Sequence, residues 1–249
     1  MHHFFVSPEQ VAEEQIRITG PDVNHMKNVL RMKNGEEVLV SDGKGNDYLC
    51  AVDSMDSGEV RAQIISVNRE GRELPSRIWL FQGLPKSDKM ELIIQKAVEL
   101  GASHIVPVAT KNAVVKLDAK KEEAKRKRWQ AIAQSAAKQS KRSLMPEVGG
   151  VMSLESAFDY IEQEGFAVRL IPYEHEAGME GSRQELMRVA PGQDIAVFIG
   201  PEGGFDEAEI ELALKKGVRP VSLGKRILRT ETAGLAILSV IMMRLEGAV

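Results

Sequence analysis

The sequence predicts an α/β protein in two parts, a small N-terminal domain made mostly of strands and a larger domain with a mainly parallel sheet. Three observations lead to this prediction: short strand-like runs within residues 1–68, a polar segment with Gly and Pro at 68–76, and alternating strand and helix patterns from residue 77 onward. Buried strands that alternate with helices are typical of a parallel sheet with helices on its faces. The predicted domains are therefore residues 1–72 and 73–249.

The N-terminal domain is expected to contain four strands and one helix. Strands are predicted at 2–6, 36–41, 48–52 and 60–67, and the residues at 42–47 form a hairpin turn between two of them. A helix is predicted over 21–31, because proline is tolerated in a first helical turn and Asn34-Gly35 marks the exit. Short strands around a single helix indicate a small β-barrel.

The larger domain is expected to alternate strands and helices up to its last residues. Strands are predicted at 78–81, 104–108, 167–171, 195–199 and 219–223, and helices at 88–100, 122–139, 154–164, 182–189, 207–216 and 231–245. The last helix is apolar on nearly every side, which is typical of a helix inside a core or at a subunit interface.

Composition places the chain among soluble globular proteins and favours the cytoplasm. Of its 249 residues, 43% are hydrophobic and 28% charged. Cys50 is the single cysteine, so no disulfide forms within the chain, and the five histidines lack metal-binding spacing. We therefore expect no metal. The sequence shows no signal-peptide pattern, and its longest apolar stretch, at 233–243, is too short to cross a bilayer.

Charge is unevenly distributed along the chain. The formal net charge is -3, yet residues 111–142 carry eleven basic side chains against three acidic ones. Clustered Lys and Arg on one element is the usual signature of binding to a phosphate backbone. A solvated helix face with surface ion pairs is the competing interpretation. The acidity of the remaining chain favours the first.

Two loops that follow predicted strands carry the strongest functional signal. The segment Gly200-Pro201-Glu202-Gly203-Gly204-Phe205 follows the strand at 195–199, and residues 223–233 follow the strand at 219–223. Open α/β sheets bind ligands at the carboxyl ends of their strands. Closely spaced glycines let the backbone approach a ligand where a Cβ would collide. The sequence therefore predicts that both loops bind a ligand.

The chemistry of the first loop argues against a phosphate ligand. A phosphate-binding loop ends in Gly-Lys-Ser/Thr and a dinucleotide fingerprint reads G-x-G-x-x-G, whereas this loop reads G-x-x-G-G. Glu202, Asp206 and Glu207 would repel phosphate, which counts against ATP and favours an amine, a sulfonium or a neutral adenine edge. The residues at 206–209 also fit a helix capping box behind an ordinary tight turn. Both interpretations remain open from the sequence.

Motifs along nearly the whole chain point to one family. They are residues 25–31 with Gly35, Lys86-Ser87-Asp88-Lys89 leading into 95–101, Trp129, Gln139-Ser140 with Arg142 and Pro146, Pro172-Tyr173-Glu174, 200–205 and 223–233. In these segments the chain resembles the ribosomal RNA small subunit methyltransferase E group of SPOUT enzymes, which methylate N3 of a uridine in 16S rRNA with S-adenosylmethionine. Where that family usually has Glu-Gln-Ser-Gly-Arg and an Arg after the Asp, this chain has residues 138–142 and Lys89. Neither difference removes a cation.

The resemblance implies a fold and a set of partners. It implies a PUA-like β-barrel over residues 1–72 and a SPOUT α/β domain over 73–249 whose C-terminal part forms a trefoil knot around S-adenosylmethionine. It also implies a homodimer packed through the knotted region and 16S rRNA of the small subunit as the substrate. The competing functions are methylation of a ribose 2′-hydroxyl and RNA binding without catalysis.

The resemblance and the loop chemistry together give the candidate site residues. Expected cofactor-binding residues are Leu170, Pro172, Tyr173, Glu174, Ile199, Gly200, Pro201, Glu202, Gly203, Gly204, Leu223, Gly224, Ile227, Leu228, Arg229, Thr230 and Ala233. Arg229, Arg142 or both are expected to stabilise the developing uracil anion electrostatically. Glu202 or Glu231 could accept the N3 proton, although each could equally be a structural carboxylate.

The expected RNA-binding residues are mostly cations. They are Lys27, Arg31, Lys86, Lys89, Gln139, Lys141 and Arg142. Lys27 and Arg31 are four residues apart and are expected on one helix face. The target base lies in folded RNA and has to turn out of it to reach the methyl group.

Overall fold

The computed structural model describes residues 1–115, 117–173 and 179–248, and the chain divides into two compact units. The first unit contains Met1–Glu73 and a later segment, Ala137–Met145, and the second contains the remaining chain. The division predicted between residues 72 and 73 did not include this return of the later segment to the first unit. Each unit is described below by itself.

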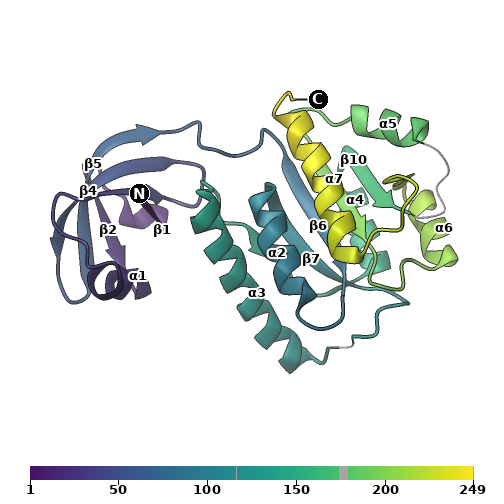
Figure 1. Ribbon diagram of the computed structural model, residues 1–249, viewed down its shortest axis with the longest axis horizontal. Coiled ribbons are helices and arrows are strands. Elements are labelled where there is room, and N and C mark those ends of the chain that lie inside the picture. The colour runs from purple at the N-terminus through teal and green to yellow at the C-terminus, as the bar shows by residue number, and fades with distance from the viewer. Residues whose placement is uncertain (116, 174–178, 249) are drawn as a thin grey trace. The chain divides into compact units, whose positions relative to one another are not determined.

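The first unit is built on one five-stranded sheet around a single core (Figure 1). Its strands are β1 (His2–Phe5), β2 (Gln15–Thr19), β3 (Glu37–Ser41), β4 (Asp47–Met55) and β5 (Glu59–Asn68), in the spatial order β1-β3-β4-β5-β2. The pair β1–β3 is parallel and the others are antiparallel. Phe4 of β1 and Ile16 of β2 lie in the same buried cluster, so both edge strands curl around a shared core, as a small barrel requires. Strand β2 was not predicted, although its alternating Ile16 and Ile18 carry a strand period.

The helix predicted over residues 21–31 ends earlier than predicted and changes from an α-helix to a π-helix along its length. A 3₁₀ turn at Pro8–Gln10 precedes β2. After β2 comes a short α1 (Pro21–Asn24), and a π-helix then covers His25–Val29. The Leu30 amide donates to the His25 carbonyl at 2.9 Å, which is the wider spacing of a π turn. Arg31 follows at φ 54, in the left-handed region. Lys27 and Arg31 are both exposed, but the expectation that they share one helix face was wrong, because Arg31 lies beyond the helix end.

Two carboxylates, Asp47 and Glu73, hold the segment Ala137–Met145 within the first unit. Asp47 accepts hydrogen bonds from the hydroxyls of Ser41 and Ser143, the latter at 2.8 Å. Glu73 accepts from the Ser143 amide at 2.8 Å and from Arg142 Nε at 2.8 Å. Arg142 is only 5% exposed, so its guanidinium has a structural role in this unit. Buried polar groups of this kind are stable only when their bonds are satisfied.

Cys50 gives a direct test of the first unit's core. Its side chain is fully buried on β4, and burial raises the pKa of its thiol to about 12. Because the thiolate is the reactive form, we expect alkylation of the native protein at pH 8 to be slower than in the unfolded chain by about a thousandfold or more. The measurement is the rate of iodoacetamide labelling with and without denaturant. Equal rates in the two states would show that this core is open.

The second unit contains a parallel sheet of seven strands. They are β6 (Arg77–Gly83), β7 (Ala102–Ala109), β8 (Glu147–Val148), β9 (Met152–Ser153), β10 (Val168–Pro172), β11 (Asp194–Ile199) and β12 (Arg219–Val221). Their order is β12-β10-β11-β6-β7-β8, with β9 beside β7, and all the recorded pairs are parallel. The predicted parallel sheet is confirmed. Strands β8 and β9 have two residues each, too few to produce a recognisable sequence pattern.

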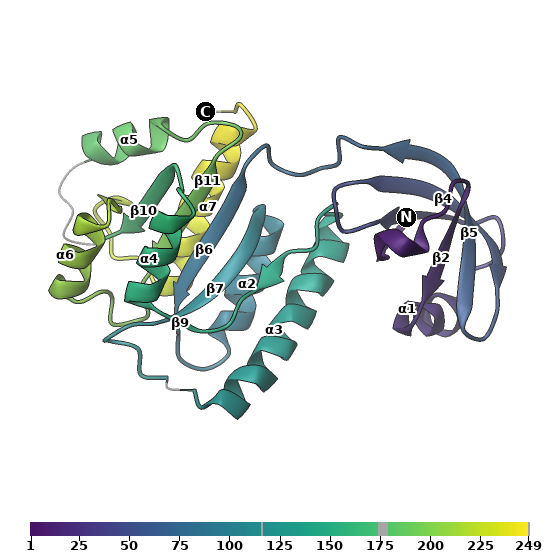
Figure 2. The same cartoon turned by 180° about the vertical axis from the view of Figure 1, so that it is seen from behind.

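Helices cover both faces of this sheet (Figures 1 and 2). The helices after β6 are α2 (Lys89–Glu99), α3 (Ala119–Ser140), α4 (Leu154–Gln163), α5 (Glu180–Met187), α6 (Glu207–Lys215) and α7 (Thr230–Leu245). Helices α2 and α7 pack against each other on one face, and α4 and α6 contact each other on the opposite face. Phe81, Phe158 and Phe198 form the core beneath α4 and α6. Within the described residues, the structure contains no helix with the length and apolarity needed to traverse a bilayer.

The apolar helix α7 is only partly covered. Ile237, Leu238 and Ile241 are fully buried, whereas Val240 is 40% and Met243 41% exposed. One side of α7 therefore packs on the sheet, and another side leaves apolar groups in contact with solvent.

The strand order explains where a site can form. Strands β12, β10 and β11 are adjacent and parallel, so their carboxyl ends lie at one edge of the sheet. The chain leaves β11, forms α6, and passes over β10 to reach β12 on its far side. Three loops therefore converge at this edge, which is where an open α/β sheet binds its ligands.

Candidate active site

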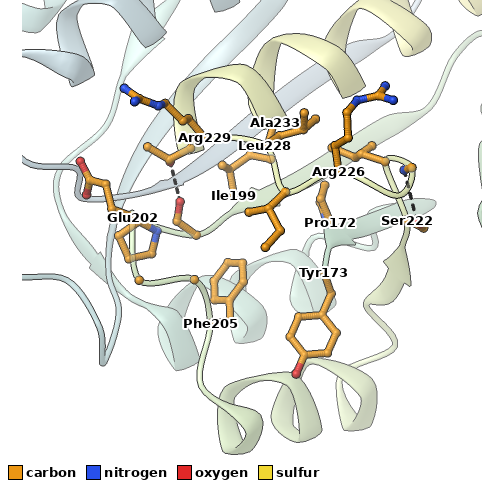
Figure 3. A pocket seen from close by; sticks show the side chains of 18 of the residues that line it. Pro172, Tyr173, Ile199, Glu202, Phe205, Ser222, Arg226, Leu228, Arg229 and Ala233 are labelled. Carbon is orange, nitrogen blue, oxygen red and sulfur yellow. Dashed lines mark hydrogen bonds between the residues drawn. The ribbon is translucent and has the colours of Figure 1, made fainter. Parts of the chain in front are cut away.

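The loops after β10, β11 and β12 enclose a cavity of about 470 Å³ (Figure 3). Its lining residues are Lys89, Pro172, Tyr173, Ile199, Gly200, Pro201, Glu202, Gly203, Gly204, Phe205, Ser222, Leu223, Gly224, Arg226, Ile227, Leu228, Arg229, Thr230 and Ala233. The cofactor-binding residues expected from the sequence are therefore gathered here, with two exceptions. Leu170 is fully buried inside β10 and does not line the cavity, and Glu174 lies outside the described residues.

Four lining residues were not predicted to bind the cofactor. Phe205 and Arg226 belong to the two loop motifs, so the motifs themselves could have identified them, and Ser222 immediately precedes the second motif. Lys89 begins α2, which follows β6, and was expected to bind RNA instead. Its position became clear only from the strand order, which places β6 beside β11.

The interior of the cavity is apolar and its rim is charged. Figure 3 shows Ile199, Phe205 and Leu228 toward its centre, while the guanidinium groups of Arg226 and Arg229 point outward. The glycines among the lining residues have no side chain, so they contribute backbone to the wall. An apolar slot with backbone hydrogen-bonding groups suits a flat, neutral heterocycle such as adenine.

The first loop is packed too closely to carry extra side chains at two points. A Cβ on Gly83, at the end of β6, would lie 2.7 Å from both the N and Cδ atoms of Pro201. A Cβ on Gly200 would lie 3.2 Å from the C and Cα atoms of Gly204. The backbone therefore makes these close approaches because both positions are glycine.

A second set of contacts fixes the outer end of this loop. Asn112 Nδ2 donates to the Gly203 carbonyl at 3.0 Å, and Lys111 Nζ lies 2.8 Å from Asp206. The hydrogen bond from Lys111 lowers the pKa of the Asp206 carboxyl. Asp206 also caps α6 in a capping box with Glu209, as expected. The capping interpretation is confirmed, and it does not compete with a ligand-binding role because the turn that caps α6 also forms part of the cavity wall.

Glu202 is engaged by groups from the start of α2. It accepts hydrogen bonds from the Lys86 amide at 3.1 Å and from Lys89 Nζ at 3.0 Å. Burial alone would raise the pKa of Glu202, but these bonds outweigh it and hold the pKa below its usual value. The same contact raises the pKa of Lys89. Glu231, at the start of α7, is 17% exposed and lies 3.5 Å from Lys89 Nζ, a longer contact.

The remaining predicted residues, including Glu231, are not among the residues that line the cavity. Lys27, Arg31, Gln139 and Lys141 are exposed residues of the first unit, and Arg142 is buried there. Lys86 is exposed in the second unit, next to Glu202. In the described parts of the chain, no three His, Cys, Asp or Glu side chains gather as a metal site would require.

The fold and the site define a class of protein. Residues 72–242 match the family model of an RNA methyltransferase domain, and residues 18–66 match that of an RNA methyltransferase PUA domain. The chain is thus an RNA methyltransferase by family, with the N-terminal PUA domain and C-terminal α/β domain that the sequence predicted.

Full-length relatives narrow the class. The ribosomal RNA small subunit methyltransferase E of Bacillus subtilis (strain 168) is 36% identical over 253 residues, which cover 99% of this chain and 98% of that protein. The protein of the same name from Synechocystis sp. is 33% identical over 99% of this chain and 78% of its own length. A crystal structure of this methyltransferase from Neisseria gonorrhoeae, bound to S-adenosyl methionine, aligns with a TM-score of 0.85 at 32% identity, covering 98% of each chain. This chain belongs to the ribosomal RNA small subunit methyltransferase E family, and the resemblance stated from its motifs is confirmed.

Proposed function

We propose that this protein transfers a methyl group from S-adenosylmethionine to N3 of a uridine in 16S rRNA of the small ribosomal subunit. The observation that carries the proposal is the convergence of three strand-end loops on one glycine-rich, apolar cavity. The relative crystallised with S-adenosyl methionine supports the choice of cofactor.

The cavity residues fit this cofactor. Ile199, Phe205 and Leu228 offer apolar faces to an adenine ring, and the loop backbone offers hydrogen bonds to its edge. Glu202 is already paired with Lys89, so the pair leaves little net charge at this part of the wall. The bound cofactor supplies an electrophilic methyl group on a sulfonium. The protein has to place uridine N3 in line with that methyl group.

Arg229 is the cation best placed to favour the reactive form of uridine. N3 carries a proton and becomes a good nucleophile only as the proton leaves, so negative charge develops on the uracil oxygens. Arg229 lies at the cavity rim with its guanidinium directed outward, where it can meet an entering base. Arg142, the other predicted stabiliser, is committed to Glu73 in the first unit. We therefore assign the electrostatic role to Arg229.

Of the two candidate proton acceptors, Glu231 fits the chemistry better than Glu202. Glu202 is held ionised by two donors, which makes it a weak base. Glu231 has the longer contact with Lys89 and a largely buried carboxylate. Replacing Glu231 with Gln should lower the single-turnover rate by about 10² to 10⁴, the usual contribution of a general base.

The matched variant, Glu202→Gln, should mainly weaken cofactor binding, because it breaks the contact between the first loop and α2. The measurement is the single-turnover rate and the dissociation constant of S-adenosylhomocysteine for each variant. A larger loss of rate in Glu202→Gln at saturating cofactor would reverse the assignment.

Exposed cations on each unit are the side chains proposed to bind RNA. Lys225 and Arg226 are exposed in the loop that lines the cavity. On the first unit, Lys27, Arg31 and Lys141 are exposed as well, and Arg31 follows a π turn, a feature frequent at functional sites. We propose that these side chains contact the RNA backbone, since phosphate contacts supply most of the affinity for nucleic acids.

We also propose a homodimer and a knotted chain in the α/β domain. The solvent-exposed apolar side chains Val240 and Met243 of α7 and Leu92 of α2 support a second copy as the covering partner. The crossing of the chain from β11 over β10 to β12 is compatible with a knot. Sedimentation at micromolar concentration should give twice the mass of one chain.

One experiment tests the proposed function. Small subunits that lack the modification are incubated with this protein and methyl-labelled S-adenosylmethionine, and the labelled nucleoside is then identified and mapped. We expect a single labelled 3-methyluridine in 16S rRNA. A methyl group on a ribose would support the 2′-O alternative, and binding of RNA without any labelled product would support a non-catalytic protein.

A further inference from the structure

Gln82 connects three parts of the second unit from a buried position. It is the penultimate residue of β6, is fully buried and does not line the cavity. Its Nε2 donates to Thr230 Oγ1 at 2.9 Å and to the Gly83 carbonyl at 3.0 Å. Thr230 Oγ1 in turn donates to the Gly200 carbonyl at 2.6 Å. The chain of bonds runs from β6 to the first residue of α7 and on to the first loop.

The direction of these bonds is fixed by their chemistry. A threonine hydroxyl has one proton, and Thr230 gives it to Gly200, whose carbonyl can only accept. The hydroxyl oxygen can then only accept from its other neighbour, so that neighbour has to be a donor. The amide of Gln82 meets this requirement, whereas a carboxylate at the same position would not.

These hydrogen bonds fix the orientation of the Gly200–Pro201 peptide in the cavity wall. The Gly200 carbonyl is directed at Thr230, and Pro201, which follows it, has no N–H. Pro201 also packs against Gly83, where a Cβ has no room. The Gly200–Pro201 peptide is thus held on one side by packing and on the other by Thr230, and Thr230 depends on Gln82.

We infer that Gln82 is a positioning residue for the cofactor cavity, acting through Thr230 to fix the Gly200–Pro201 peptide and the start of α7. The identity of the ligand rests on the proposed function; the positioning role rests on the hydrogen bonds alone. Arg229 and Ala233 reach the cavity wall from the start of α7, so the same contact aligns both cavity loops.

The substitution Gln82→Glu tests this role because it replaces the donating amide group with a carboxylate that only accepts, while the side chain keeps nearly the same shape. As a carboxylate, residue 82 could only accept a hydrogen bond, so the Thr230 hydroxyl would donate to it. The Gly200 carbonyl would then lose the hydrogen bond from Thr230. As a protonated acid, it could again donate to Thr230. Burial raises the pKa of an introduced carboxyl, so both forms are reachable between about pH 5.5 and 9. We expect S-adenosylhomocysteine to bind about tenfold more weakly at the upper end of this range and to recover most of its affinity at the lower end.

Two further variants and one further measurement make the result decisive. Gln82→Met has no donor at any pH and should bind S-adenosylhomocysteine about tenfold more weakly throughout the range. Gln184→Glu makes the same chemical change at an exposed residue of α5 and should follow the unsubstituted protein. The unfolding temperature without ligand is measured for each protein over the same pH range.

The inference fails if Gln82→Glu and Gln82→Met, while folded, both bind within twofold of the unsubstituted protein at high pH. It also fails if the affinity of Gln82→Glu shows no dependence on pH beyond that of Gln184→Glu. If Gln82→Glu does not fold, a normal affinity in Gln82→Met would overturn the inference and a weakened affinity at a normal unfolding temperature would support it. Absence of S-adenosylhomocysteine binding in the unsubstituted protein would instead reject the proposed cofactor, so the two failures are distinguishable.

Discussion

Replacement of Arg229 by alanine should remove nearly all turnover while cofactor affinity stays within a few-fold of its original value. The guanidinium of Arg229 points outward from the cavity rim, so the cofactor loses little contact when it is removed. The uracil anion loses its nearest proposed positive charge. Removing one preorganised group that stabilises developing charge typically costs about 10² to 10³ in rate.

The matched control for Arg229→Ala is the same substitution at Arg226, which lies on the same rim. Arg226→Ala removes the same charge from the same loop, and in Figure 3 its guanidinium also points outward, at another part of the rim. We expect this variant to weaken RNA binding and to retain the single-turnover rate at saturating RNA. The measurements are the single-turnover rate and the dissociation constants of S-adenosylhomocysteine and of the RNA. Equal losses of rate in the two variants would mean that Arg229 contributes only positive charge to the rim and has no specific role at the uracil.

Gly83→Ala should nearly abolish cofactor binding, although Gly83 itself is not part of the cavity lining. The new methyl group would meet the N and Cδ atoms of Pro201 at 2.7 Å, and a backbone atom cannot move aside as a flexible side chain can. The first loop would have to shift as a whole. We expect the dissociation constant of S-adenosylhomocysteine to rise about 100-fold, and stability to fall by about 1 to 3 kcal/mol from overpacking.

Gly181→Ala provides the comparison for this variant. Gly181 lies in α5, where a Cβ would have no other atom within 4 Å. Alanine favours a helix over glycine by about 0.5 to 1 kcal/mol, so stability should rise slightly and cofactor binding should not change. Calorimetric titration and thermal unfolding of both proteins are sufficient. Normal affinity in Gly83→Ala would show that the loop adapts freely.

The sequence predicted the elements of the second unit well because their signals are local. Each signal is contained in a few consecutive residues, as in the apolar run at 195–199 and the capping residues at 206–209. The two loop motifs likewise identified most of the cavity wall. What could not be predicted depended on contacts between distant residues. Lys89 and Gln82 acquire their roles from the placement of β6 beside β11, which no local pattern encodes.

The first unit shows the same limit. The exposed Arg31 was placed on a helix because Pro21 and Asn34-Gly35 mark a helix start and exit, but the helix continues as a π turn and ends at Val29. Arg142 was expected at the reaction centre because a motif surrounds it. Its burial against Glu73 depends on a contact between residues about seventy positions apart. Long-range pairing of this kind is invisible to periodicity.

The return of residues 137–145 to the first unit means that this unit is not encoded by one continuous stretch of gene. A fragment that stopped at residue 73 would retain Asp47 with its bond from Ser41, but it would lose the Ser143 hydroxyl that also donates to Asp47 and the Arg142 and Ser143 groups that donate to Glu73. Both carboxylates would then lack hydrogen bonds that they make in the complete chain. To excise a stable module, a protein engineer would have to graft the later nine residues onto the earlier fragment, by a linker or by circular permutation.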